Sequence, residues 1–283
     1  MAVDLHMHSN RSDGVFAPAA LVELCRESGV VLMSLTDHDT MSGSAEAAEA
    51  AQALGIGFIP GVEVSSCWAG ISIHVVGLGI DPSSPSAKAR FESVLSMRDR
   101  RAREMAAAFD RLGIRGSYEG AYALAPNKAN IGRAHFARWL LQAGLVPNYQ
   151  AAFDRYLAAG APCFVPTPWP SVEESVAFIH AEGGIAVLAH PGRYKFSAGW
   201  GVEALLEHFK AVQGDAIEVT SGSQPSDTAL FYAEAAHRFG FLASTGSDWH
   251  GASSGRPKPG RQMPLPAGLE PVWTRFGYPR ELA

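Results

Sequence analysis

Short apolar runs alternate with amphipathic stretches in two parts of the chain. In residues 1–83 the apolar runs predict strands at Val3–Met7, Val30–Leu35, Phe58–Val64 and Ile71–Ile80. In residues 162–283 they predict strands at Ile185–Leu188, Ala216–Thr220 and Phe241–Thr245. Helical spacing predicts intervening helices, which include Pro18–Ser28, Ser42–Leu54, Ser171–Glu182 and Asp227–Phe239. This alternation predicts an α/β protein with a mainly parallel sheet.

The middle of the chain follows a different pattern. From Ser84 to Ala161 no run reads as a strand, whereas helical spacing predicts helices at Ala87–Leu112, Ala134–Ala143 and Tyr149–Ala159. Pro162 to Pro170 carries four prolines and is predicted to be the linker that returns to the sheet. We therefore predict a helical insertion at residues 84–161, within an α/β domain formed by residues 1–83 and 162–283.

The first predicted strand brings two histidines to one face. His6 and His8 are two residues apart, so on a strand their side chains project from the same side. Asp13 follows after a turn and offers a carboxylate oxygen. Two imidazoles and a carboxylate can hold a metal ion. A single H-x-H motif is equally compatible with two exposed strand histidines, so the prediction depends on the rest of the chain.

Residue types that ligate metals recur where the later strands end. Six of the ten histidines lie at or near a strand end. Besides the first three residues, the candidates are His38, Glu63, His74, His190, Asp248 and His250. Parallel α/β folds form their sites at the carboxyl ends of the strands. Because burying unpaired polar groups is costly, we predict that these residues converge on a polynuclear metal site.

The predicted ligands are imidazoles and carboxylates, without a thiolate. This combination suits Mn²⁺, Fe²⁺ or Zn²⁺, and so many ligands fit roughly two or three ions rather than one. Glu63 is the natural bridging residue. Closely spaced ions stabilise the attacking and leaving oxygens of a phosphoryl displacement and activate a water molecule. The sequence therefore predicts a metal-dependent phosphoesterase.

The order of these motifs resembles that of a known family. The series H-x-H, D-G, T-D-H-D, G-x-E, a lone strand histidine, A-H-P and G-S-D-x-H is similar to that of the PHP (polymerase and histidinol phosphatase) family. The helical insertion and the motif G-S-D-W-H-G resemble those of its TrpH/YciV-like branch. The resemblance covers about residues 1–85 and 160–255. It implies a distorted (β/α)7 barrel of the PHP type, with an inserted helical cap subdomain and up to three metals.

The resemblance also implies roles for individual residues. It places the first metal on His6, His8, Glu63 and Asp248, the second on Asp13, His38 and His250, and the third on Glu63, His74 and His190. Catalysis is assigned to Glu63, Asp248 and His190. Some members carry histidine where this chain has Asp13, and the harder oxygen favours Mn²⁺ or Mg²⁺ over Zn²⁺ there. Two or three divalent ions, most of all Mn²⁺, are therefore expected.

Two pairs of residues are candidates for substrate binding. Arg133 and His135 lie at the start of a predicted helix, and a helix N-terminus beside an arginine is a good anion site. Arg193 and Lys195 closely follow His190 in the sequence. Two separate clusters predict a substrate with two phosphates. The resembled branch removes the 3′-phosphate of nucleoside 3′,5′-bisphosphates and trims short RNA from its 5′ end. The alternative for all four residues is a role on the solvated surface.

Three alternatives for the function stay open. One is a phosphatase of a small non-nucleotide phosphomonoester, such as histidinol phosphate. Another is an amidohydrolase-type C–N hydrolase, although such barrels commonly bridge their metals with a strand lysine and this chain has Glu63 there. The third is a non-catalytic metal-bound module, in which loss of ligands would be expected. The complete ligand set favours the phosphoesterase.

Net charge and hydropathy limit the classes of molecule with which the chain is expected to interact. The net charge of −5 provides no basic field for long nucleic acid, so a nucleotide or short RNA is the expected substrate. No run of eighteen apolar residues is present, and the N-terminus lacks the pattern of a signal peptide. Three widely spaced cysteines form no disulfide framework. The chain is therefore expected to act in the cytoplasm and away from membranes.

Overall fold

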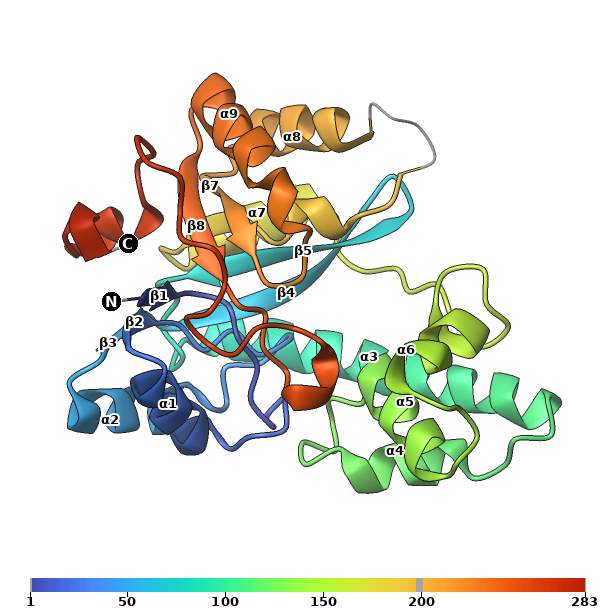
Figure 1. Ribbon diagram of the computed structural model, residues 1–283. Coiled ribbons are helices and arrows are strands. Elements are labelled where there is room, and N and C mark those ends of the chain that lie inside the picture. The colour runs from blue at the N-terminus through green and yellow to red at the C-terminus, as the bar shows by residue number, and fades with distance from the viewer. Residues whose placement is uncertain (1, 197–200, 283) are drawn as a thin grey trace.

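The computed structural model describes residues 2–196 and 201–282 (Figure 1). Their strands form two sheets. The three-stranded sheet holds β1 (Ala2–Asp4), β2 (Val30–Met33) and β3 (Gly57–Phe58), all parallel. The five-stranded sheet holds β4 (Gly61–Trp68), β5 (Ile71–Leu78), β6 (Ile185–Leu188), β7 (Ala216–Ser221) and β8 (Leu242–Gly246). The α/β class is confirmed, and parallel pairing prevails except for β5, which runs antiparallel to β4 and β6.

Helices cover the outer faces of the sheets. α1 (Pro18–Glu27) and α2 (Ser44–Leu54) lie together beside the smaller sheet, and α7 (Val172–Ala181), α8 (Gly201–Ala211) and α9 (Ala229–Phe239) surround the larger one (Figure 1). A capping box opens α7, since the Ser171 hydroxyl accepts from the N–H of Glu174 and the Glu174 carboxylate accepts from the N–H of Ser171. Among the described residues no helix is long and apolar enough to cross a membrane.

The strand predicted at Phe58–Val64 is two strands in different sheets. β3 ends at Phe58 and β4 begins at Gly61, with Pro60 between them. Proline has no N–H to donate to a ladder, so the chain changes partners at this point. The single strand predicted there is wrong, and its residues instead connect the two sheets.

The described residues form no closed barrel ladder. Isolated parallel bridges join the two sheets, one between Met7 and Trp249 and another between His38 and Glu63. These bridges lie in the segments that follow β1, β2 and β8 and that carry the predicted metal ligands. The chain there departs from regular strand geometry, as the left-handed backbone of Asp39 (φ 50°) and Asp248 (φ 51°) shows. The two sheets are thus joined by isolated bridges and not by a continuous ladder, so the (β/α)7 barrel implied by the resemblance is not closed among the described residues.

Residues 84–161 contain helices and no strand, as the sequence pattern predicts, while their being a separate inserted subdomain stays a prediction. They contain α3 (Pro85–Arg111), α4 (Ser117–Leu124), α5 (Arg133–Gln142) and α6 (Tyr149–Ala152), which stand to one side of the sheets (Figure 1). α4 was not predicted. Most of these helices share a hydrophobic cluster of their own, built around Phe109, Phe136 and Leu140. The first turns of α3 are different, because Ala87 and Phe91 pack in the core of the larger sheet.

Candidate metal centre

The nine predicted ligands lie together at one edge of the two sheets. His6 and His8 follow β1, His38 follows β2, and Asp248 and His250 follow β8. Their ligand atoms fall into four overlapping groups, within each of which all atoms lie within 4.8 Å of one another. The groups are His8, Asp13, His38 and His250; His6, His8 and Asp248; His6, Glu63 and His190; and His38, Glu63 and His74. The convergence predicted from the strand ends is therefore observed.

Glu63 lies at the centre of the cluster and is almost fully buried. Its Oε1 lies 2.7 Å from Nδ1 of His74 and 3.0 Å from Nε2 of His190. Its Oε2 lies 2.9 Å from Nδ1 of His38 and 3.2 Å from Nε2 of His8. Because its two oxygens face different imidazoles, this carboxylate is placed where it could bridge two cations.

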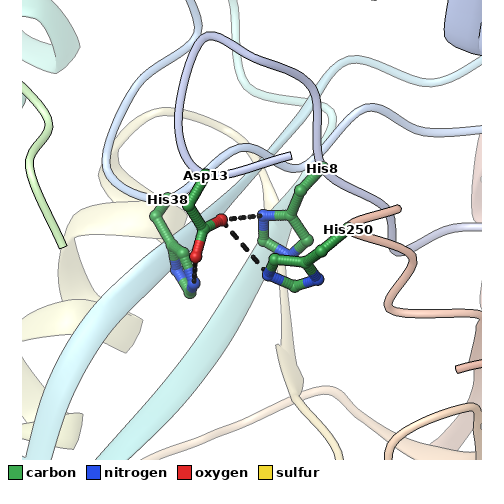
Figure 2. Close-up of side chains that lie close together, drawn as sticks. All are labelled: His8, Asp13, His38 and His250. Carbon is green, nitrogen blue, oxygen red and sulfur yellow. Dashed lines mark ion pairs between the residues drawn. The ribbon is translucent and has the colours of Figure 1, made fainter. Parts of the chain in front are cut away.

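Asp13 faces a second part of the cluster, shown in Figure 2. Its Oδ1 lies 3.2 Å from Nε2 of His250 and 3.7 Å from Nδ1 of His8. Its Oδ2 lies 4.0 Å from Nε2 of His38. The four side chains come from three different strand ends and the loop after β1, and they enclose one point (Figure 2).

Asp248 completes the set on the side of β8. Its Oδ1 lies 3.3 Å from Nε2 of His8 and 3.6 Å from Nε2 of His6. The grouping differs from the ligand sets implied by the resemblance. His8 also joins the group of Asp13, and Glu63 is absent from the group of His6, His8 and Asp248. In addition, His74 lies with His38, while His190 lies with His6. Glu63 is common to both groups, so the assignment of ligands to individual ions stays a prediction.

The donor atoms fit cations better than they fit one another. Within the described part of the chain, several buried polar atoms of the cluster have no hydrogen-bond partner although they approach neighbours closely. They include Oδ1 of Asp13, Oε2 of Glu63, and Nδ1 of His38, His74 and His190. Burying such atoms unpaired costs about 1–3 kcal/mol each. Close approach without hydrogen-bond alignment is expected where lone pairs point at a shared ion.

The protonation states of one carboxylate and of two imidazoles also suit metal binding. Burial would raise the pKa of Glu63, but the surrounding imidazoles, His38 foremost, hold it well below its usual range. Burial lowers the pKa of His74 to about 3 and that of His250 to about 4. These groups are therefore an ionised carboxylate and neutral imidazoles, the forms that ligate metals.

His6 and His8 are the exception. Burial lowers the pKa of His8, but the carboxylates of Asp248, Glu63 and Asp13 outweigh this effect and raise it to about 9. Burial likewise lowers the pKa of His6, while Glu218, Glu63 and Asp248 raise it well above its usual value. A cation would compete with these protons for the same electron pairs. The excess of buried carboxylate charge is what such a cation would neutralise.

Glu218 is a site residue that sequence reasoning missed. It lies in β7, is 1% exposed, and its Oε1 lies 2.5 Å from Nδ1 of His6. Its Oε2 accepts a hydrogen bond of 2.7 Å from the backbone N–H of His190, whose φ is 32°. The available signal was an acidic residue between the apolar Ile217 and Val219 of a buried strand.

Asp37 and Asp39 support the cluster from either side of His38. Asp37 accepts hydrogen bonds from the hydroxyls of Ser9 and Ser12, both at 2.6 Å, which fixes the loop between His8 and Asp13. Asp39 accepts from Nε of Arg98 at 2.8 Å. Burial would raise the pKa of Asp39, but the Arg98 guanidinium holds it below its usual value. Arg98 belongs to α3, so the helical insertion contacts the ligand segment directly.

The predicted substrate residues lie in different surroundings. Arg193 is near the cluster, with Nη1 3.7 Å from Oδ2 of Asp248 and a side chain that is 41% exposed. Lys195 is exposed, and no contact between described residues ties it to the cluster. Arg256, which was not predicted, lies nearer: its Nη1 is 2.9 Å from Oδ1 of Asp248. Its position in the irregular C-terminal segment gave no signal.

Arg133 and His135 begin α5 in the helical insertion. Nη1 of Arg133 donates to the carbonyl of Leu157 at 3.3 Å, and burial lowers its pKa to about 10, with Arg193 contributing. His135 is buried, and its Nδ1 accepts from the N–H of Gly132 at 3.1 Å. Burial lowers its pKa to about 4, so its ring is neutral with the proton on Nε2. That atom has no partner among the described residues.

The chain is similar to known proteins over nearly its whole length. The PHP domain family matches residues 4–162. A 3′,5′-nucleoside bisphosphate phosphatase from Chromobacterium violaceum is 41% identical over 271 residues, which cover 96% of this chain and 95% of that protein. A 5′-3′ exoribonuclease from Haemophilus influenzae is 41% identical over 273 residues, which cover 96% of this chain and 98% of that protein. A solved C. violaceum structure, described as an amidohydrolase with bound sulfate and no metal, has a TM-score of 0.93 and 40% identity, covering 98% of this chain and 96% of that one.

Proposed function

The chain belongs to the PHP domain family, and from this premise we propose that it is a metal-dependent phosphoesterase acting on nucleotides. The proposed reaction removes the 3′-phosphate of a nucleoside 3′,5′-bisphosphate and also trims short RNA from its 5′ end. The observation that carries the proposal is the convergence of nine imidazole and carboxylate ligands around Glu63. The names of the two relatives at 41% identity support the choice of substrate.

We propose that the cluster holds two or three divalent ions, with Mn²⁺ first and Fe²⁺ or Zn²⁺ as alternatives. Their ligands would be His6, His8, Asp13, His38, Glu63, His74, His190, Asp248 and His250. Ligands of this kind without a thiolate favour these ions. When bound, such ions polarise phosphoryl oxygens and lower the pKa of a water molecule.

The residues of the chain itself prepare the centre for this chemistry. Glu63, Asp248 and His190 are the proposed catalytic residues, because they supply donor atoms to the middle of the cluster. Glu218 holds the proton of His6 on Nδ1 and leaves Nε2 facing the cluster. Arg193 and Arg256 place guanidinium groups beside Asp248, where they can bind the non-bridging oxygens of a phosphate.

We propose that residues 84–161 form a cap that anchors the second phosphate. Two hydrogen bonds hold the helical insertion against the loop that carries Asp13: Asn127 donates to the carbonyl of Arg11, and Arg138 donates to that of Asp13. Arg133 and the free Nε2–H of His135 supply the proposed anchor. His135 is buried and Arg133 is half-buried, which strengthens their interaction with an anion.

One alternative retains support from a comparison. The solved C. violaceum structure is described as an amidohydrolase, which is a C–N hydrolase class. The donor set favours the phosphoesterase, because the residue that joins the groups of ligands is Glu63 and no lysine is among them. A phosphatase of a small phosphomonoester uses the same centre and is separated from the proposal by its substrate alone.

A substrate panel tests the proposal. Phosphate release with Mn²⁺ is measured for adenosine 3′,5′-bisphosphate, histidinol phosphate and p-nitrophenyl phosphate, and shortening is measured for a 5′-phosphorylated RNA tetramer. We expect the highest kcat/KM for the bisphosphate, and loss of all activity in Glu63→Gln. The exposed Glu23 of α1 provides a matched control, Glu23→Gln. Preference for histidinol phosphate would support the alternative substrate, and hydrolysis of amides alone would overturn the proposal.

A further inference from the structure

A cavity of about 300 Å³ lies at the carboxyl end of β7. It is formed by the end of β7, the start of α9 and the C-terminal segment. The lining residues are Thr220, Ser221, Gly222, Gln224, Pro225, Ser226, Ala229, Pro257, Arg261, Gln262 and Met263. None of them belongs to residues 84–161. The cavity is therefore separate from the phosphate anchor proposed in the helical insertion.

Two short connections tie this cavity to the metal centre. The side-chain oxygen of Gln224 accepts a hydrogen bond of 3.0 Å from the N–H of Gly192, two residues after His190. Pro257 directly follows Arg256, whose Nη1 lies 2.9 Å from Oδ1 of Asp248. The lining residues Gln224 and Pro257 are thus each connected, through Gly192 and Arg256 respectively, to the segments that carry or contact the cluster.

The lining has the chemistry that a nucleotide requires. Pro225, Pro257 and Met263 provide an apolar surface, and the Met263 side chain is 48% exposed. Arg261 provides an exposed cation. Oε1 of Gln262 is a buried acceptor without a partner in the described part of the chain, although its amide group donates to the carbonyl of Val3. Base faces bind apolar side chains, phosphates bind arginine, and base amino groups donate to acceptors.

We propose that this cavity binds the nucleotide on the 3′ side of the scissile phosphate in a short RNA substrate. The proposal rests on the proposed function and extends it to a second nucleotide. If the helical insertion anchors the 5′-phosphate of the first nucleotide, the phosphate on its 3′-oxygen lies over the metal centre. The next nucleotide is attached to that phosphate and must continue away from the insertion. The cavity is linked to the centre through Gln224 and Arg256 and takes no residue from the insertion.

The same bond breaks in both substrates. Water forms a new bond to phosphorus, the bond from phosphorus to the 3′-oxygen of the first nucleotide breaks, and that oxygen takes a proton. From a bisphosphate the products are a nucleoside 5′-phosphate and inorganic phosphate. From RNA the phosphate stays on the 5′-oxygen of the second nucleotide. The two substrates therefore differ only in the group that the cavity would bind.

The test compares these substrates in variants of Arg261. For each variant kcat/KM is measured with adenosine 3′,5′-bisphosphate and with the 5′-phosphorylated dinucleotide of adenosine. In Arg261→Ala we expect kcat/KM to fall about tenfold or more for the dinucleotide and to stay within about twofold for the bisphosphate. Arg261→Lys should recover part of the loss. Arg275→Ala, which removes an exposed arginine outside the cavity, is the control and should change neither substrate.

The outcomes separate this proposal from the one on which it rests. Equal changes for the two substrates in Arg261→Ala, or no change in either, overturn the second-nucleotide site. A wild-type protein that hydrolyses the bisphosphate but leaves the dinucleotide intact also overturns it, while the phosphatase assignment stands. A wild-type protein that hydrolyses neither substrate with Mn²⁺ refutes the proposed function, and this inference falls with it.

Discussion

Oε1 of Glu218 lies 2.5 Å from Nδ1 of His6, although the two residues are 212 positions apart in the chain. The other oxygen of the same carboxylate accepts from the backbone N–H of His190. One buried acid of β7 therefore fixes the ring orientation of one predicted ligand and the backbone of another. Carboxylates placed behind metal-binding histidines commonly tune metal affinity in this way.

Replacing Glu218 should weaken metal binding without removing a ligand. In Glu218→Gln the charge is lost while the shape is kept, so we expect metal affinity to fall about 10- to 100-fold. Competition with a chromophoric chelator measures this affinity independently of activity. Glu207→Gln, an exposed site on α8, is the control. Unchanged affinity in Glu218→Gln would show that the His6 contact does not orient a ligand.

Purified protein prepared without chelator should carry two or three first-row divalent ions per chain. Because Glu63 belongs to two of the ligand groups, Glu63→Gln should lose more than one of these ions. Elemental analysis with a protein assay gives the ratio. Removal of the ions should also lower the thermal midpoint, since a ligand bound to the folded state stabilises it. One ion or none in the wild-type protein would contradict the polynuclear centre.

Arg133 should matter for a second phosphate and not for a simple phosphoester. Charge-assisted contacts contribute about 1.5–3 kcal/mol each, so Arg133→Ala should lower kcat/KM for the nucleoside 3′,5′-bisphosphate roughly 10- to 150-fold. Hydrolysis of p-nitrophenyl phosphate should hardly change. Arg193→Ala, close to Asp248, should slow both substrates alike. If Arg133→Ala slows the two substrates equally, the phosphate anchor is wrong.

The ion pair between Arg98 and Asp39 should stabilise the fold measurably. Arg98→Met leaves the Asp39 carboxylate buried without its partner, which costs roughly 3–5 kcal/mol in the free energy of unfolding. Denaturant titration measures the change. Arg103→Met in the same helix removes the pair with Asp99, whose arginine is 62% exposed, and should change stability little. Similar losses in the two variants would refute a special role for Arg98.

The pH dependence of the Arg98→Met effect has a definite sign. Folding lowers the pKa of Asp39, so its contribution to stability is present above the pKa of the unfolded state and is lost as the pH falls through that of the folded state. The difference between wild type and Arg98→Met should therefore shrink below about pH 4, near the ordinary aspartate pKa. A difference that grows in acid would contradict this account.

The sequence located the candidate ligands because strand geometry constrains where they lie. Residues such as His6 and His8 follow short apolar runs, and the carboxyl ends of parallel strands meet whatever the details of the loops. The partner of His6 could not be found in the same way, because nothing in the local pattern pairs a strand residue with Glu218. The division of the strand at Pro60 had a readable signal, since proline removes a ladder donor.

The boundaries of the helical insertion were less visible. α4 (Ser117–Leu124) was missed because it is short and contains Gly120, a poor helix former. The start of α3 was assigned to the insertion, although Ala87 and Phe91 pack with the larger sheet. A hydrophobic pattern shows which face of a helix is buried, but not which of two cores covers it.

α3 contributes to two cores as one uninterrupted helix. It spans 27 residues, about 40 Å at 1.5 Å per residue, with its first turns in the core of the larger sheet and Ala102 to Phe109 in the other. A single helix that packs in both cores connects them rigidly and offers no flexible hinge between them. The helical insertion should therefore keep a fixed position relative to the metal centre, and substrates should enter and leave without a swing of the whole insertion.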